Sequence, residues 1–181
     1  KYGQHINLGC FRVEFIRTNH SIQDAAALAI YSPAGIVVHT GDFKIDYTPV
    51  FGDAIDLQRF AEIGKKGVLA MMSDSTNAEK AGFTMSEKTV GVTFDHLFAE
   101  HCNSRIIIAT FASNVDRVQQ IIYTAEKYDR KVVIEGRSMV NIISTAAELG
   151  YINIPDNIMI DIEQIKNYPD EKLVLITTGS Q

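Results

Sequence analysis

The sequence lacks any apolar run of the ~18 residues that a membrane-spanning helix requires. It also lacks a paired-cysteine motif: Cys10 and Cys102 are isolated in a chain of 181 residues, which favours reduced thiols. No segment rich in proline, glycine or serine separates parts of the chain, so those parts are expected to pack together. These absences predict a folded cytoplasmic protein without a membrane partner.

A surplus of positive charge is also missing. The formal net charge is −5 at pH 7, and neither half of the chain is a basic patch. Non-specific affinity for nucleic acid comes mainly from Lys and Arg side chains that neutralise phosphates. A nucleic-acid ligand would therefore have to be held by a few cationic side chains, backbone N–H groups and bound metal ions.

The sequence does contain enough apolar residues for a sizeable core, at 46% of the chain. In the first part, strands are predicted over 11–16, 35–38 and 67–72, with an amphipathic helix near 56–62. In the second part, helices over 87–101, 114–127 and 139–149 alternate with strands over 105–111, 131–134 and 173–177. This alternation predicts an α/β protein with a parallel sheet flanked by helices, and the change of pattern predicts two domains, 1–86 and 87–181.

Three short polar clusters follow the predicted strands of the first part. They contain His20, Asp42 and Asp74. An imidazole and carboxylates fixed at strand ends are the donors that a metal-dependent hydrolase needs, which makes these residues candidate metal ligands and catalytic groups. A single His or Asp after a strand is more often a turn or cap residue, so the prediction depends on all three together.

Polar and small residues also follow the strands of the second part. In an open parallel sheet, ligands lie outside the carboxyl ends of the strands, where helix N-termini present N–H groups to anions. The phosphate-binding candidates at these ends are Ser113, Asn114, Arg137, Ser138 and Ser180. Two alternatives stay open: the Ser and Asn side chains also suit helix capping, and Arg137 also suits pairing with Glu135 or Asp129.

The segments FIRTNHSIQD, VVHTGDFKID and MMSDSTNAE, which carry His20, Asp42 and Asp74, resemble the β-CASP nucleases of the metallo-β-lactamase superfamily, and most closely ribonuclease J. The segments ATFASNVDRVQQ, EGRSM and TTGSQ resemble the same family. The resemblance covers essentially the whole chain. It implies part of a metallo-β-lactamase αββα fold in residues 1–86 and a β-CASP domain, incomplete at its C-terminal end, in residues 87–181.

This resemblance implies a zinc-dependent ribonuclease that hydrolyses RNA in maturation and decay. His20 would bind zinc, Asp42 would bridge two zinc ions, and Asp74 would order a His ligand or the attacking water. RNA is the implied substrate, and a homo-oligomer or a paralogue is an implied partner. Because the family's His-x-His-x-Asp-His segment is absent, the chain is expected to be an internal fragment, inactive alone and weak in zinc binding.

Further residues near these clusters are candidates for supporting roles. Asp24 and His39 are candidates for orienting the ligands, and Phe43 and Tyr47 for stacking a base. Asp116 departs from the family, which often has His at this position.

Two other functions remain open. A hydrolase of the same fold that acts on a thioester or lactam would share His20 and Asp42, but it does not account for the βα units after residue 86. A non-catalytic α/β interaction module would lose no function when His20 is replaced.

Overall fold

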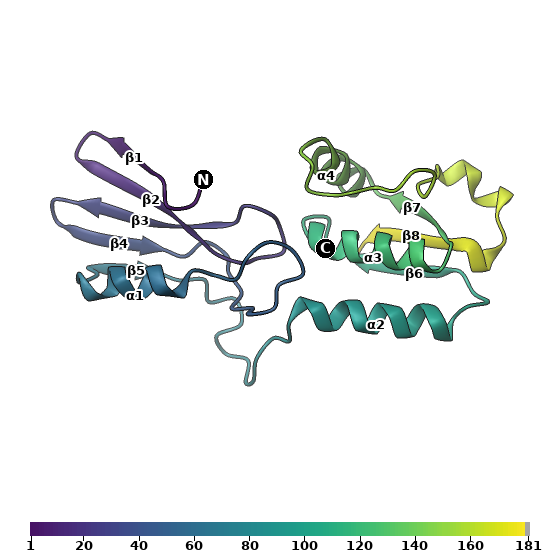
Figure 1. Ribbon diagram of the computed structural model, residues 1–181, viewed down its shortest axis with the longest axis horizontal. Coiled ribbons are helices and arrows are strands. Elements are labelled where there is room, and N and C mark those ends of the chain that lie inside the picture. Colours follow the sequence, from purple (N-terminus) through teal and green to yellow (C-terminus); the bar gives the residue numbers. More distant parts are fainter. Residues whose placement is uncertain (180–181) are drawn as a thin grey trace. The chain divides into compact units, whose positions relative to one another are not determined.

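The computed structural model describes residues 1–179, and the chain divides into two units, Lys1–Ser86 (unit 1) and Glu87–Gln181 (unit 2) (Figure 1). In the described residues, no helix combines the length and the apolar character that crossing a membrane would take. Each unit has its own sheet and its own hydrophobic core.

Unit 1 is built on a five-stranded sheet in the order β1-β2-β3-β4-β5. Neighbouring strands from β1 to β4 are antiparallel, and β4 and β5 are parallel. The elements are β1 (His5–Leu8), β2 (Phe11–Arg17), β3 (Ala26–Ser32), β4 (Gly35–His39), α1 (Leu57–Lys65) and β5 (Ala70–Met72). The third predicted strand, over 67–72, is therefore shorter than expected, and β5 is an exposed strand at the end of the sheet.

Strands β1 and β3 are not predicted by the sequence pattern. Strand β3 reads AALAIYS, and alanine has a low strand propensity, so its pattern is weak. The small side chains nevertheless suit the position, because Ala27 and Ala29 are fully buried under α1 in a core with Ile16, Val38 and Ile63. β3 pairs antiparallel with both β2 and β4, and these two strands consequently run in the same direction.

Helix α1 begins one residue after Asp56, whose side chain accepts a hydrogen bond from Arg59 N as an N-cap. The helix is anchored to the sheet by a charged contact as well as by its apolar face. Arg59 donates to both carboxylate oxygens of Glu14 on β2, at 2.6 and 2.9 Å, and Tyr31 on β3 donates its hydroxyl to the same carboxylate at 2.9 Å. Glu14 is 5% exposed, so this contact supplies a buried carboxylate with its hydrogen-bond donors.

Unit 2 contains the parallel sheet that the sequence predicts, in the order β6-β8-β7, with helices packed against it. Helices α3 and α4 contact β7, and α2 packs against α3. The elements are α2 (Glu87–Glu100), β6 (Ile106–Thr110), α3 (Val115–Lys127), β7 (Lys131–Glu135), α4 (Arg137–Glu148), η1 (Ile162–Asn167), η2 (Asp170–Lys172) and β8 (Leu173–Thr178).

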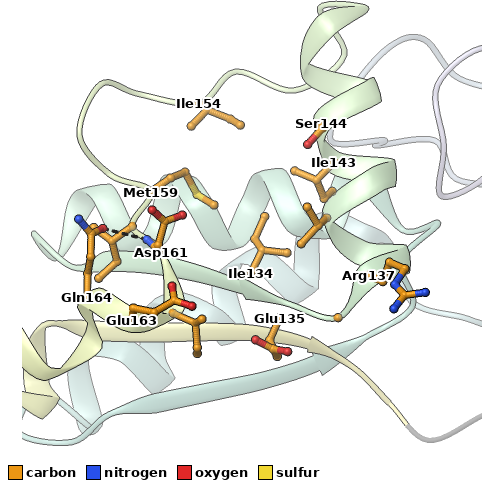
Figure 2. A pocket seen from close by; sticks show the side chains of 14 residues that line it. Ile134, Glu135, Arg137, Ile143, Ser144, Ile154, Met159, Asp161, Glu163 and Gln164 are labelled. Atoms are coloured by element: carbon orange, nitrogen blue, oxygen red, sulfur yellow. Dashed lines mark hydrogen bonds between the residues drawn. The ribbon is translucent and has the colours of Figure 1, made fainter.

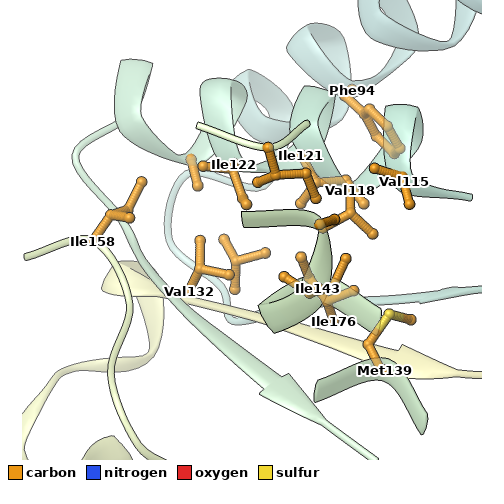
Figure 3. Close-up of a cluster of buried hydrophobic side chains, with 14 of the residues drawn as sticks. Phe94, Val115, Val118, Ile121, Ile122, Val132, Met139, Ile143, Ile158 and Ile176 are labelled. Carbon is orange, nitrogen blue, oxygen red and sulfur yellow. The ribbon is translucent and has the colours of Figure 1, made fainter. Parts of the chain in front are cut away.

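The core of unit 2 lies between its sheet and its helices (Figure 3). Helix α3 supplies Val118, Ile121 and Ile122, which point toward Val132 of β7 and Ile176 of β8. Met139 and Ile143 of α4 and Phe94 of α2 complete the same cluster. Because α3 follows β6 and α4 follows β7, the core fixes where these two helices begin relative to the carboxyl ends of the strands.

Replacing Glu14 by Gln should lower the free energy of unfolding by about 2 to 4 kcal/mol at pH 7, because the amide presents N–H groups to Arg59 and removes the buried carboxylate from the contact, which leaves Glu62 as the ion-pair partner of Arg59. Hydrogen bonding from Arg59 lowers the pKa of Glu14 below its usual 4.5. The contribution of the carboxylate is therefore present above pH 4.5 and is lost as the pH falls through the folded-state pKa. Urea unfolding at pH 7 and pH 3 measures this, and an undiminished difference at pH 3 would contradict it.

Candidate functional site

The carboxyl ends of β2, β4 and β5 meet at one edge of the sheet in unit 1, here named edge A. Strands β2 and β4 are parallel through their shared partner β3, and β5 pairs parallel with β4 in the register His39 to Met72. His20 follows β2, Asp42 follows β4 and Asp74 follows β5. The fold thus brings the three predicted site residues to a single edge, although they are separated by 22 and 32 positions in the sequence.

Hydrogen bonds join the three loops of edge A to one another. Thr40 N donates to Met72 O at 3.0 Å, and Asp74 N donates to the Thr40 hydroxyl at 3.0 Å. Lys44 N donates to Asn19 O at 2.7 Å, which joins the β4 loop to the loop that carries His20. Thr40 is 4% exposed, so its hydroxyl is a buried connection between the Asp42 and Asp74 loops. No role for Thr40 or Asn19 follows from the sequence, because the groups with which these residues join the loops lie more than 20 positions away along the chain.

Asp74 is held as a carboxylate. Hydrogen bonds from the Thr76 hydroxyl, at 2.6 Å, and from Thr76 N, at 2.9 Å, lower its pKa, and the charge of His20 adds to the effect. Both Thr76 donors bind Oδ1, which is the ordinary turn arrangement for an Asp after a strand. The other oxygen, Oδ2, receives only the long contact from Phe43 N at 3.5 Å. Asp74 therefore has a turn role and keeps one oxygen with capacity to accept.

His20 and Asp42 are exposed at edge A, and the His20 ring contacts the neighbouring Ser21 hydroxyl at 3.3 Å. The imidazole and carboxylate donors match the chemistry of a borderline divalent ion such as zinc. Their number does not complete a site: within residues 1–179, no group of three or more His, Cys, Asp or Glu side chains converges as metal ligands do. Edge A therefore fits part of a metal-binding ligand set.

The two residues proposed to orient the ligands differ in what they contact. His39 accepts a hydrogen bond from Gly41 N at 3.0 Å through Nδ1, so it holds the backbone next to Asp42. Gly41 has φ +61°, and a Cβ at this position would lie 3.2 Å from Ala26 O on β3. The turn that presents Asp42 therefore requires glycine. Asp24 lies in the loop after His20 with φ +59°.

The carboxyl ends of β6, β7 and β8 form a second edge, here named edge B, in unit 2. Ser113 is exposed next to Asn114, and Arg137 and Ser138 are exposed at the start of α4. Ser180 lies outside the described residues. The side chain of Asn114 is buried and accepts from Arg117 N at 3.1 Å, so it caps α3 as the alternative interpretation proposed. Its capping role leaves Ser113, Arg137 and Ser138 as the predicted phosphate-binding side chains that are exposed at edge B, where the Glu135 carboxylate is exposed as well.

Helix α4 begins differently from α3. Its N-cap is Gly136, at φ +104°, and no side chain of residues 1–179 caps its first turn. A Cβ on Gly136 would lie 3.4 Å from the Thr178 hydroxyl of β8. The glycine therefore allows the backbone at the start of α4 to lie close to β8 as well as to form the turn. The N–H groups of the first turn of α4 are available to an anion, which a helix N-terminus favours.

Arg137 has no ion-pair partner within the described residues, and Asp129, one of its two expected partners, pairs with Lys172 instead. A cavity of about 470 Å³ is lined by residues of β7, α4, η1 and the segment that leads into η1, and Figure 2 shows the side chains that line it. Arg137 lies on the far side of this cavity from Asp161 and Glu163. Because carboxylates line the cavity, an anion is better placed at the start of α4 than inside it.

Asp116, in the first turn of α3, is the most perturbed acid of unit 2. Burial raises its pKa to about 6, and the neighbouring Glu87 carboxylate adds to the increase. Arg117 donates to Glu87 at 2.8 Å. Within residues 1–179, no side-chain hydrogen bond or ion pair joins Arg117 to Asp116. Oδ1 of Asp116 is buried without a hydrogen-bond partner in the described part of the chain. This position departs from the resembled family, and its carboxylate carries a desolvation cost.

Comparison with known proteins identifies the region that contains edge B. The family model "Ribonuclease J, beta-CASP domain" matches residues 103–181. The chain carries the beta-CASP domain of the ribonuclease J family. Ribonuclease J of Synechocystis sp. is 50% identical over 171 residues, which cover 94% of this chain and 27% of that protein. Ribonuclease J of Helicobacter pylori is 48% identical over 176 residues, which cover 97% of this chain and 25% of that protein.

The similarity to ribonuclease J thus extends over both units, and the chain spans about a quarter of the length of these curated relatives. A crystal structure of a protein of unknown function from Enterococcus faecalis matches 100% of this chain and 44% of its own chain, with a TM-score of 0.66 and 18% identity. At that identity the match supports the fold alone. The sequence-based prediction of the ribonuclease J family and of its α/β fold is confirmed.

Replacing Asp116 by Asn should stabilise the protein by about 2 kcal/mol at pH 7, because the amide has no charge to desolvate. The folded-state pKa of about 6 lies above the ordinary 3.8, so the carboxyl is more protonated in the folded state between these values. The gain from the substitution should therefore be absent below pH 4 and should grow between pH 4 and pH 6.

Urea unfolding at pH 4 and pH 7 measures the difference. The matched control is Glu126→Gln, an exposed acid on the same helix, which should be nearly neutral at both values. An equal gain from Asp116→Asn at both pH values would contradict the desolvation argument.

Proposed function

We propose that this chain forms part of a metal-dependent ribonuclease that hydrolyses phosphodiester bonds of RNA. The observation that carries the proposal is the convergence of His20, Asp42 and Asp74 at edge A, in a chain whose relatives are named ribonuclease J. Zinc is the metal that the imidazole and carboxylate donors favour. A cytoplasmic location and an oligomeric or paralogous partner stay predictions from the sequence.

Each residue of edge A has a distinct contribution in this proposal. The exposed His20 ring nitrogen and Asp42 carboxylate are the groups that would hold the metal, and further ligands would come from outside this chain. Such an ion supplies Lewis acidity toward a phosphodiester and lowers the pKa of water. Asp74 is fixed through Oδ1 by Thr76, and its Oδ2 is left to orient a neighbouring donor.

Edge B would hold the RNA backbone. A phosphate near the start of α4 would meet the uncapped N–H groups of the first turn, the Ser138 hydroxyl and the Arg137 guanidinium. This arrangement concentrates the contacts in a few donors, which agrees with a chain whose net charge is −5. Ser113 adds an exposed hydroxyl beside the α3 N-terminus.

Replacing Asp42 by Asn should reduce RNA cleavage on the order of 10³-fold or more when the chain is extended to the length of its relatives, because an amide lacks the negative charge with which Asp42 would hold a divalent cation. Cleavage of a labelled single-stranded RNA measures the effect, with circular dichroism as the check of folding. Asp156→Asn, an exposed acid of unit 2, is the control and should keep full activity. Near-normal cleavage by the Asp42 variant would remove Asp42 from the proposed metal site, whereas no cleavage by the unaltered protein would favour the non-catalytic interaction module.

Replacing Arg137 by Ala should weaken binding of single-stranded RNA by roughly 1 to 3 kcal/mol and reduce the salt dependence of affinity by about one unit of slope. Titrations of this chain at several salt concentrations measure both. The matched control is Arg105→Ala, at the amino end of β6 on the opposite side of the same sheet, where the arginine is exposed and pairs with Asp170. A lowered melting temperature with an unchanged slope would assign Arg137 a structural role.

A further inference from the structure

A second cavity of about 550 Å³ lies in unit 1, next to edge A. Its walls include Phe43 and Lys44 from the β4 loop, Asp74, Ser75 and Asn77 from the β5 loop, and Phe83 from the segment that follows. We name it the Phe43–Phe83 cavity. It shares Asp74 with the proposed catalytic edge, so a ligand that enters it lies beside the groups proposed to cleave RNA.

The exposure of Phe83 distinguishes this cavity from the other cavity described above. Phe83 is 88% exposed, the highest value among the large apolar side chains of the described residues. Single exposed apolar residues are common, so exposure alone indicates nothing. Here, however, the exposed ring is one wall of a cavity whose other walls include the half-buried ring of Phe43 and a lysine.

The aromatic wall at Phe43 is rigidly connected to the proposed site. Phe43 N contacts Asp74 Oδ2 at 3.5 Å, and the next residue, Lys44, is joined through its own N–H to Asn19 O. The backbone at Phe43 is therefore held by the same contacts that join the loops of edge A. Phe83, in contrast, follows Gly82 at φ +99° in a segment outside helices and strands.

The charges of the cavity indicate which part of a nucleotide fits. Asp74 is ionised, since hydrogen bonds from Thr76 lower its pKa, and an anionic phosphate placed against it would be repelled. A neutral, flat base is not repelled by a carboxylate and stacks on aromatic rings. Hydroxyl and amide groups of Ser75 and Asn77, which have no partner in the described residues, can hydrogen-bond to a base edge. Lys44, which pairs with Asp46 at 3.8 Å, is the cation among the residues that line the cavity.

We propose that the Phe43–Phe83 cavity binds one base of single-stranded RNA next to edge A, with Phe83 as the stacking platform. This proposal rests on the proposed RNA-cleaving function and names the part of the substrate that unit 1 holds. Stacking tolerates every base because each has a π-face, so the cavity positions the strand without selecting a sequence.

Binding of a single-stranded RNA that contains 2-aminopurine tests the proposal with this chain. Phe83→Ala should weaken affinity about 5- to 100-fold and abolish the stacking-dependent quenching of 2-aminopurine fluorescence. Phe83→Trp should retain both, and Phe83→Leu, which keeps apolar surface but has no π-face, should behave like the Ala variant. The control is Phe11→Ala: Phe11 is 46% exposed and begins β2, at the end of the strand away from His20.

The outcomes separate this proposal from the function on which it rests. If the chain binds RNA and Arg137→Ala weakens that binding while Phe83→Ala does not, the stacking role is wrong and the RNA-binding function stands. If Phe83→Leu binds as tightly as the parent chain, Phe83 makes an ordinary apolar contact and the stacking role is likewise overturned. If the parent chain does not bind RNA, both proposals fall together.

Discussion

The common direction of β2, β4 and β5 is the constraint on which the arrangement of unit 1 depends. Antiparallel pairing of β3 with both of its neighbours makes β2 and β4 parallel, and β5 then adds parallel to β4. Because a parallel strand leaves the sheet at the same edge as its partner, three loops from distant parts of the sequence meet. If β3 were absent, nothing in the sheet would fix His20 relative to Asp42.

Parallel strands also bring loops to one edge of the sheet in unit 2, but there the strands are connected through helices. There the three strands are all parallel, and helices return the chain between them, so the N-termini of α3 and α4 lie at the carboxyl ends. Asn114 caps the N-terminus of α3, whereas α4 begins at Gly136 and has no side-chain cap from the described part of the chain. The N-termini of α3 and α4 thus occupy equivalent positions in the topology but differ in the N–H groups that a ligand can reach. The difference comes from the N-cap residue, Asn114 in α3 and Gly136 in α4.

A buried carboxylate in unit 1 and one in unit 2 differ in their hydrogen-bond partners and in the direction of their pKa shifts. Glu14 receives donors from Arg59 and Tyr31, and hydrogen bonding lowers its pKa. Asp116 has a buried oxygen without a partner in the described residues, and burial raises its pKa. The first carboxylate joins a helix to a sheet. The second weakens the fold at neutral pH, at the helix N-terminus next to edge B, where structural cost is often associated with a binding surface.

The sequence by itself determined the family, the α/β class, the parallel sheet of unit 2 and the strands that precede His20, Asp42 and Asp74. These follow from local properties: hydrophobic period, β-branched runs and motifs whose residues are contiguous. It did not determine β3, because alanine gives a weak strand pattern, and so it could not give the geometric reason that three polar clusters meet. Only the tertiary structure decided that Thr40 connects two loops, that Arg137 has no ion-pair partner in the described residues, and that the exposed Phe83 lines the same cavity as Phe43. Each of these depends on how segments far apart in the chain are brought together, and that is set by strand pairing and burial.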